Sequence, residues 1–498
     1  MKNKNKNILR LIALACISCM YACVNDKGNY DYIPKEGLFP VEITGLKDSS
    51  FLLRTTVELH PTIKGLDEDL SKYDFLWYTY PEGVSGYAPQ RDTIGHSPDL
   101  SFVITYPPGE TRVLIFEIKE KRTGVMANQK VRITTSSIFS RGWFVVNDLS
   151  DQTDVDFITP SGEVSEDVIS QANGQKLEGK GVKILLHSSY YHDKLMPDGK
   201  LTRLSNQVVF HVLSDRDMKT VNASSMEVYK NWEDEFFTPP AVRKPQDVFA
   251  GAFGGAFLIN DGKLHAIMGM MSGPGKFGYA KLGDPDLYPC IVIDDYAWDA
   301  VVFGRTTSSF LSGGSGAELA NVVSGSGIQA VNMDYDMLWM QLRSSSYLAL
   351  AWAIMQSKSL PTEYYLVDID AYGTYNPIVE FHLLNPAARV LAADVYGIHQ
   401  EHTAAFYFAK GNLLSYFQKG DSLGDDEVDL YTFPAGETIS YVGKNSTTTN
   451  LEVLTNSGNT WKLYIFSLAG NGQYAYLADN TPLAVYSGNG NARFVLYR

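Results

Sequence analysis

Residues 139–498 show a loose recurrence of an apolar strand, a glycine-centred turn and a second, aromatic-rich strand, and this pattern most constrains the fold. Clear examples lie at 256–264, 405–413 and 451–459, and the region opens on Gly142-Trp143. Asn-Asp-Gly or Lys-Gly-Asn between two apolar runs indicates a hairpin turn. Propeller repeats span roughly 40 to 50 residues. We therefore predict a C-terminal β-propeller of about seven blades; the alternative is a large irregular β-sandwich or barrel.

The segment 37–137 has a different texture, with short runs of period-2 alternation between turn residues. The expected strands lie at 55–59, 73–80, 100–105, 111–119 and 130–134. Such spacing over about 100 residues predicts an immunoglobulin-like or PKD-like β-sandwich, with its central strand around Trp77. The fold class is therefore all-β. Helices are expected only in short pieces, with 317–323 and 347–356 as the best candidates.

The first 22 residues have the features of a signal peptide. Four basic residues precede an apolar run of about a dozen residues, which is too short for the ~20 residues of a spanning helix. The small residue Ala22 directly precedes Cys23, as in a bacterial lipobox. We expect diacylation of Cys23 and a lipidated tether over 23–36. A general secretory signal, or modification at Cys19, is the alternative.

The net charge limits the classes of molecule that the protein is expected to bind. The chain carries a formal charge of −14, and the loss of the four basic residues within 1–22 would bring it to −18. Such an acidic protein repels phosphate backbones, so we expect no nucleic-acid partner. Cys290, the one cysteine beyond the N-terminal segment, is expected to be a buried apolar side chain.

Catalytic motifs are absent from the sequence. Gly313-Gly314-Ser315-Gly316-Ala317 lacks the last glycine of a nucleophile elbow. Gly275-Lys276 is followed by Phe277, where a phosphate loop needs Ser or Thr. We therefore expect no catalytic residues, no enzyme activity and no cofactor.

The sequence also gives little support for a metal site. His399 and His402 are three residues apart and form the nearest metal-ligand pattern, but a structural or surface role is favoured. The sequence from Asp368 resembles a calcium loop up to its sixth position and fails at the twelfth, Val379. The acidic run 421–429 is expected to be a solvated turn rather than a calcium site.

Two aromatic clusters are candidates for ligand contact. Tyr190 and Tyr191 lie between histidines, and Tyr296 and Trp298 lie between aspartates, in stretches that resemble exposed loops. Aromatic faces next to polar groups can stack on sugars or contact peptides. Ordinary packing between strands is the alternative for all four rings.

The lipobox Cys23, the following Asp26 to Tyr32 (Asp-Lys-Gly-Asn-Tyr-Asp-Tyr), the Trp-containing sandwich and the Gly142-Trp143 opening together resemble the PKD-like family lipoproteins of Bacteroidota. A secondary match is the segment 234–240. The resemblance carries no catalytic residues. It implies an outer-membrane surface lipoprotein beside a SusC-like TonB-dependent transporter and a SusD-like lipoprotein. The single acid soon after Cys23 is a departure, and it leaves a periplasm-facing location open.

These observations favour a non-enzymatic, lipid-anchored accessory or ligand-binding subunit of a nutrient importer, facing the cell exterior, with an oligopeptide favoured over a glycan as ligand. The alternatives are a propeller hydrolase or lyase that acts on polysaccharide or peptide, and a propeller that binds a metal or a siderophore.

Overall fold

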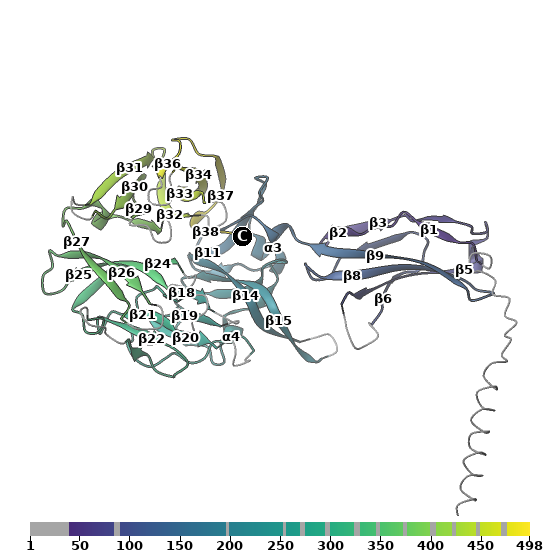
Figure 1. Cartoon of the computed structure of the whole chain (residues 1–498), viewed down its shortest axis with the longest axis horizontal. Coiled ribbons are helices and arrows are strands. Elements are labelled where there is room, and N and C mark those ends of the chain that lie inside the picture. Colours follow the sequence, from purple (N-terminus) through teal and green to yellow (C-terminus); the bar gives the residue numbers. More distant parts are fainter. Residues whose placement is uncertain are drawn as a thin grey trace, which may run out of the picture. The chain divides into compact units, whose positions relative to one another are not determined.

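The computed structural model describes residues 39–83, 90–195, 199–251, 255–268, 274–293, 299–322, 329–344, 349–371, 376–398, 405–420, 425–444, 449–469 and 476–498. The chain divides into two compact units, Met1–Ser136 and Ser137–Arg498. The described parts of both units are built almost entirely from antiparallel strands joined by turns (Figure 1). Within the described ranges, no helix combines the length and the apolar character needed to cross a membrane.

The described part of the first unit contains three sheets. The largest has the order β2-β9-β8-β5-β6, with β2 parallel to β9. Its strands are β2 (Ser49–Leu52), β5 (Tyr73–Pro81), β6 (Asp92–Gly95), β8 (Thr111–Glu120) and β9 (Met126–Ser136), and η1 (Leu70–Lys72) precedes β5. The smaller sheets pair β1 (Glu42–Thr44) with β4 (Thr62–Lys64) and β3 (Thr56–Leu59) with β7 (Leu100–Val103).

One apolar core lies between these sheets. The buried ring of Trp77 in β5 stacks on Phe116 of β8, with 4.2 Å between the centroids. Its Nε1 donates a hydrogen bond to the Ser97 carbonyl at 2.8 Å. Leu100 of β7 and Ile133 of β9 belong to the same cluster. The predicted sandwich is confirmed, although β8 rather than the strand of Trp77 is the middle strand of the larger sheet.

Seven larger sheets follow one another along the described part of the second unit, and we number them in chain order. Sheet 1 holds β10 (Trp143–Leu149), β11 (Gln152–Ile158), β12 (Val164–Ser165), β13 (Leu177–Glu178) and β38 (Asn491–Tyr497). Sheet 2 holds β14 (Gly181–Leu195), β15 (Leu201–Ser214), β16 (Met218–Asn222) and β17 (Val228–Lys230). Sheet 3 holds β18 (Pro245–Ala250), β19 (Ala256–Asn260) and β20 (Lys263–Ile267), and sheet 4 holds β21 (Ala300–Gly304), β22 (Ser309–Gly313) and β23 (Ala320–Asn321).

The remaining sheets each have four strands. Sheet 5 holds β24 (Tyr335–Ser344), β25 (Leu350–Ser357), β26 (Tyr364–Asp370) and β27 (Ile378–Leu384). Sheet 6 holds β28 (Val395–Ile398), β29 (Ala405–Lys410), β30 (Leu413–Gln418) and β31 (Asp426–Thr432), and sheet 7 holds β32 (Thr438–Lys444), β33 (Leu451–Ser457), β34 (Thr460–Phe466) and β37 (Ala484–Asn489). Smaller elements are η2 (Ile138–Ser140), α3 (Val168–Asn173), α4 (Trp232–Glu235), η6 (Arg389–Ala392) and the ribbon of β35 (Leu468–Ala469) and β36 (Tyr476–Leu477).

An apolar cluster fills the space between each pair of neighbouring sheets. Between sheets 1 and 2, for example, Phe144 packs on Phe210 with 4.5 Å between the ring centroids. A further cluster joins sheet 7 to sheet 1 through Leu463 and Val145. Because each sheet packs on the next and the last packs on the first, the sheets form a closed ring. The predicted β-propeller architecture is therefore confirmed. The number of blades stays a prediction, because segments beside sheets 3, 4 and 7 lie outside the described ranges.

The two ends of the second unit meet in sheet 1. The C-terminal β38 pairs antiparallel with β10, so the ring closes by strand pairing. Two indole hydrogen bonds reinforce this closure between sheets 1 and 7. Trp143 Nε1 donates to Glu452 Oε1 at 2.6 Å, and Trp461 Nε1 donates to Asp156 Oδ2 at 3.0 Å.

The turn chemistry behaves as predicted. β19 and β20 pair around Asp261 and Gly262, whose φ angles are 49° and 69°, which is the left-handed region that a tight hairpin turn requires. β29 pairs with β30, and β33 pairs with β34, around Gly411 and Gly458.

The two helix predictions, at 317–323 and 347–356, are wrong. β23 lies within the first segment, and β25 occupies most of the second. The run of β25 is rich in helix-forming Ala, Leu and Met, but it pairs with β24 and β26 on its two sides and is buried. Burial of a central strand overrides the local helix preference.

Candidate functional site

The inner strands of the ring enclose a cavity of about 420 Å³. Its wall comes from β14, β18, β24, β28, β32 and β38, together with residues 289–291. Every lining residue is buried or half-buried. A volume of this size lies within the range of small-molecule sites, which are mostly apolar with a few placed polar groups. The cavity is therefore the candidate ligand site.

Aromatic rings from five different strands line this cavity, and Phe249 of β18 is one of them. Trp339 of β24 stacks on Tyr396 of β28, with 4.7 Å between centroids and 23° between the planes. Tyr441 of β32 meets Phe494 of β38 edge to face at 5.0 Å. The hydroxyl of Tyr396 donates to the Val390 carbonyl at 2.8 Å, which fixes the orientation of that ring. Flat rings held in this way offer stacking surfaces at little entropic cost.

A single ion pair supplies the charged groups of the lining. Lys183 Nζ lies 2.6 Å from Asp247 Oδ1, and it also donates to the Val248 carbonyl at 3.1 Å. The second carboxylate oxygen of Asp247 accepts the Ile291 amide at 2.9 Å. The two opposite charges cancel, and the pair presents no net charge to the cavity.

Two glutamines and Ser440, whose hydroxyl donates to the Leu454 carbonyl, complete the polar lining. Gln246 accepts the Gly262 amide at 2.6 Å through Oε1. Gln341 of β24 is half-buried and makes no side-chain hydrogen bond to another described residue, so its amide is available to a ligand.

A second polar cluster lies inside sheet 2, where each strand contributes one or two buried side chains. His187 Nδ1 lies 2.9 Å from His211 Nε2, and His211 Nδ1 lies 2.8 Å from the Thr220 hydroxyl. Thr220 in turn donates to Glu235 Oε1 at 2.5 Å. This chain of hydrogen bonds ties α4 to the middle of the sheet.

Lys230 belongs to the same region and holds residues 274–275 against the sheet. Its Nζ donates to the Tyr190 hydroxyl at 2.6 Å and to the Pro274 carbonyl at 2.9 Å. The Tyr190 hydroxyl donates to the Gly275 carbonyl at 2.8 Å. These contacts give the cluster a clear structural role.

Burial shifts the pKa values of titratable side chains in this cluster. Burial raises the pKa of Glu235 to about 7, and the nearby Lys230 charge opposes that rise. Burial lowers the pKa of His187 to about 4, so its imidazole is neutral at pH 7. Perturbed groups of this kind mark functional sites in some proteins. Here they lie within a hydrogen-bonded core and not in the lining of the cavity.

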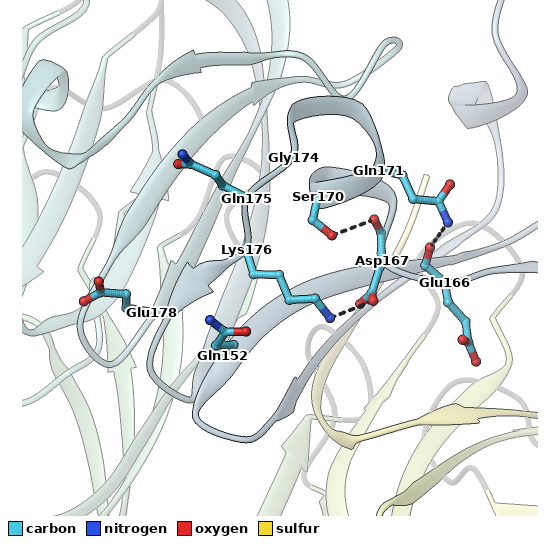
Figure 2. A pocket seen from close by; sticks show the side chains of 9 residues that line it. All are labelled: Gln152, Glu166, Asp167, Ser170, Gln171, Gly174, Gln175, Lys176 and Glu178. Atoms are coloured by element: carbon cyan, nitrogen blue, oxygen red, sulfur yellow. Dashed lines mark hydrogen bonds and ion pairs between the residues drawn. The ribbon is translucent and has the colours of Figure 1, made fainter.

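A second hollow, of about 710 Å³, lies on the outer side of sheet 1 (Figure 2). Its lining is polar throughout and mostly exposed. Asp167 lies at its centre with a left-handed φ of 56°, and it pairs with Lys176 at 2.6 Å. Gln171 Nε2 donates to the Glu166 carbonyl at 2.7 Å. Because this hollow is more open to solvent and has no aromatic residue in its lining, it is the weaker candidate for a small ligand.

The structure describes two of the four aromatic residues that were predicted to contact ligand. Tyr190 and Tyr191 were expected as exposed rings in a loop, but both lie in β14. Tyr190 is fully buried, so the exposed-loop interpretation is wrong for this residue; its polar neighbours are buried partners rather than signs of a surface. Tyr191 is half-buried. Its contact with ligand stays a prediction.

Several predicted residues fall on segments that lie outside the described residues: Cys23, Tyr296, Trp298, His399 and His402. Lipidation, ligand contact and the weak metal alternative at these positions stay predictions.

Three of the four described acids of the 421–429 run are not simply solvated, because they form ion pairs, whereas Asp426 is exposed. Asp425 lies 2.6 Å from His382 Nε2, and Arg389 pairs with Glu427 and Asp429. Among the described residues, no group of three or more His, Cys, Asp or Glu side chains is placed to hold a metal ion. Cys290 is buried, as predicted, and it borders the central cavity.

Lys183, Asp247, Trp339, Tyr396 and Gln341 were not predicted as site residues. Asp247 carried a usable signal, since it is the single charge in the strand β18. Lys183 carried a weaker one, because its strand β14 also contains Asp193 and Lys194. The aromatic residues Trp339 and Tyr396 carried no signal in the sequence, because aromatic residues are common throughout the strands.

Comparison with solved structures finds remote likenesses. A quinonprotein alcohol dehydrogenase-like protein from Bacteroides thetaiotaomicron VPI-5482 is 12% identical, with a TM-score of 0.40, and the match covers 91% of this chain and 96% of that one. An auxiliary nutrient binding protein from Bacteroides ovatus ATCC 8483 is 9% identical, with a TM-score of 0.32, and the match covers 83% and 95% of the two chains. No curated protein matches the sequence. Identities of this size carry no information about activity.

The N-terminal part of the chain gives a clearer result. The model of the PKD-like family matches residues 23–181, from the proposed lipobox cysteine through the first unit and into sheet 1 of the propeller. This match confirms the PKD-like part of the resemblance over residues 23–181.

Proposed function

We propose that this protein is a surface-exposed outer-membrane lipoprotein that serves as a non-enzymatic, ligand-binding accessory subunit of a SusCD-like, TonB-dependent nutrient importer. The observation that carries the proposal is the central cavity, which combines stacking rings with a few fixed polar groups. The lipobox at Cys23 and the tether over 23–36 would supply the membrane anchor. A SusC-like transporter and a SusD-like lipoprotein are the proposed partners, and an oligopeptide or a glycan is the proposed nutrient.

The cavity suits binding better than catalysis. Its carboxylate, Asp247, accepts bonds from Lys183 and from a backbone amide, so it has no free oxygen positioned as a general base. The acids with strongly raised pKa values, Asp156 and Glu235, lie within packed interfaces and hold the fold together.

Affinity purification of the tagged full-length chain from native outer membranes tests the partnership. We expect it to recover a SusC-like transporter and a SusD-like protein. We expect Cys23→Ser to shift the protein out of the membrane fraction. Protease added to intact cells should degrade the wild-type protein; protection from protease would place it on the periplasmic side instead.

The enzyme alternative is tested separately. Turnover of any member of a broad glycan and peptide panel, abolished by substitution of an acid, would replace the binding proposal with a hydrolase or lyase. Metal that copurifies with the protein and is lost in His402→Ala would support the metal-binding alternative.

A further inference from the structure

We infer that the central cavity takes an uncharged, ring-bearing ligand, a neutral sugar unit of an oligosaccharide, rather than the charged end of a peptide. This inference rests on the proposed ligand-binding role and names its ligand class. It reverses the preference for oligopeptides drawn from the sequence, and the reason lies in the charges of the cavity wall.

The first step concerns charge. A free peptide carries an ammonium and a carboxylate at its ends, and burying either group without a partner is costly. The charged side chains of the cavity wall, Lys183 and Asp247, are 2.6 Å apart and already bonded to each other. Both also bond to the backbone, Lys183 to the Val248 carbonyl and Asp247 to the Ile291 amide. A charged ligand end would have to break this pair to gain a partner.

The second step concerns shape. Trp339 and Tyr396 form one stacked pair in the wall, and Tyr441 and Phe494 form another contact further around the ring. The apolar faces of sugar rings pack well on such aromatic surfaces. The aromatic side chains lose little conformational entropy when the ligand binds, because the surrounding core already holds them. Trp339 belongs to the cluster between sheets 5 and 6, so its position is fixed by the fold.

The third step concerns hydrogen bonds. Gln341 presents an amide with both a donor and an acceptor, and it has no side-chain hydrogen bond to another described residue. A sugar hydroxyl is also both donor and acceptor, so it can satisfy this amide without bringing a charge. The cavity therefore combines stacking rings, a neutral hydrogen-bonding group and a self-compensated ion pair, and a neutral sugar unit matches all three.

Isothermal titration calorimetry with the purified full-length chain tests the inference. The probes are neutral trisaccharides of glucose, galactose, mannose and xylose, the zwitterionic peptide trialanine, and the acidic trisaccharide of galacturonic acid. We expect at least one neutral trisaccharide to bind and to change the emission of the tryptophans, because Trp339 lines the cavity. Trialanine and the acidic sugar should bind at least tenfold more weakly.

Two variants locate the binding. Gln341→Ala should weaken sugar binding about five- to tenfold, the effect of one lost hydrogen bond. Gln152→Ala is the matched control, because that glutamine lies in the exposed hollow on sheet 1, and it should leave the affinity unchanged. Far-ultraviolet circular dichroism and urea unfolding of Gln341→Ala, compared with the wild type, distinguish a lost contact from a lost fold.

The inference is overturned if trialanine binds more tightly than every neutral sugar, if no neutral sugar binds, or if Gln341→Ala and Gln152→Ala have equal affinities. These outcomes are distinct from failure of the accessory role. Sugar binding without recovery of a transporter would refute the partnership and leave the cavity assignment standing, whereas recovery of a transporter without sugar binding would do the reverse.

Discussion

Replacement of Trp461 by phenylalanine tests the closure of the propeller. Trp461 is fully buried between sheets 7 and 1, and its Nε1 donates to Asp156 Oδ2 at 3.0 Å. Burial raises the pKa of Asp156 to about 7, and the bond from Trp461 opposes that rise. Above pH 7 the substitution therefore removes a donor from a buried, charged carboxylate.

The expected cost has two parts. Loss of a hydrogen bond to a charged group costs roughly 1.5–3 kcal/mol, and the smaller ring adds about 1–2 kcal/mol from lost packing and a residual cavity. The total is about 2.5–5 kcal/mol at pH 8. At pH 5 Asp156 is protonated in the folded state, so the lost bond is a neutral one worth roughly 1 kcal/mol, and the cost of the substitution falls.

Trp352→Phe is the matched control. Trp352 is equally buried, but its Nε1 has no hydrogen-bond partner among the described residues. Its replacement should cost only the packing part, about 1–2 kcal/mol, at either pH. Urea unfolding followed by far-ultraviolet circular dichroism gives both values without relying on tryptophan emission. The closure argument is refuted if the two variants lose the same stability at pH 8. It is also refuted if Trp461→Phe loses the same stability at pH 5 as at pH 8.

Three further variants test other parts of the fold by the same unfolding assay. Gly397→Ala should destabilise the protein by roughly 1–3 kcal/mol, because the added Cβ would lie 2.4 Å from a backbone carbonyl of β32; Gly278→Ala, whose nearest neighbour would be 3.7 Å away, should be tolerated. Glu235→Gln should reduce the pH dependence of the free energy of unfolding. The raised pKa of Glu235, about 7, means that its contribution is present below pH 4.5 and lost as the pH rises through 7, and a neutral amide has no such loss. Trp77→Phe removes the bond to the Ser97 carbonyl at 2.8 Å and should cost about 1–2 kcal/mol in the first unit; an unchanged transition would contradict the role given to that bond.

The strands of both units could be predicted from the sequence because their determinants are local. Alternation of Phe116 and Ile118 with Glu117 and Lys119 indicates that one face of β8 lies in the core, and Phe116 and Ile118 are both fully buried. The turn at Asp261-Gly262 is equally local, since its left-handed φ angles require these residue types. Alternation fails where a strand is buried on both faces, as in β25, and there the sequence indicated a helix instead.

The cavity could not be predicted because its wall is assembled from residues far apart in the chain. Lys183 and Asp247 are 64 residues apart, and no local pattern indicates that they meet. The prediction at Tyr190 failed for a related reason. Polar neighbours along the sequence suggested exposure, but in the fold Tyr190 meets Lys230, 40 residues away, and this pairing allows a polar hydroxyl to be buried.

Closure of the ring and formation of the cavity depend on the same strand. β38 pairs with β10 and completes sheet 1, and its Phe494 also lines the central cavity against Tyr441 of sheet 7. The aromatic wall is therefore incomplete until the C-terminal residues have joined the first sheet. It follows that a ligand that binds this wall selects the closed ring, and its binding energy adds to the stability of the closed state. The indole bonds between sheets 7 and 1 stabilise the fold, and through the fold they hold the candidate ligand site in shape.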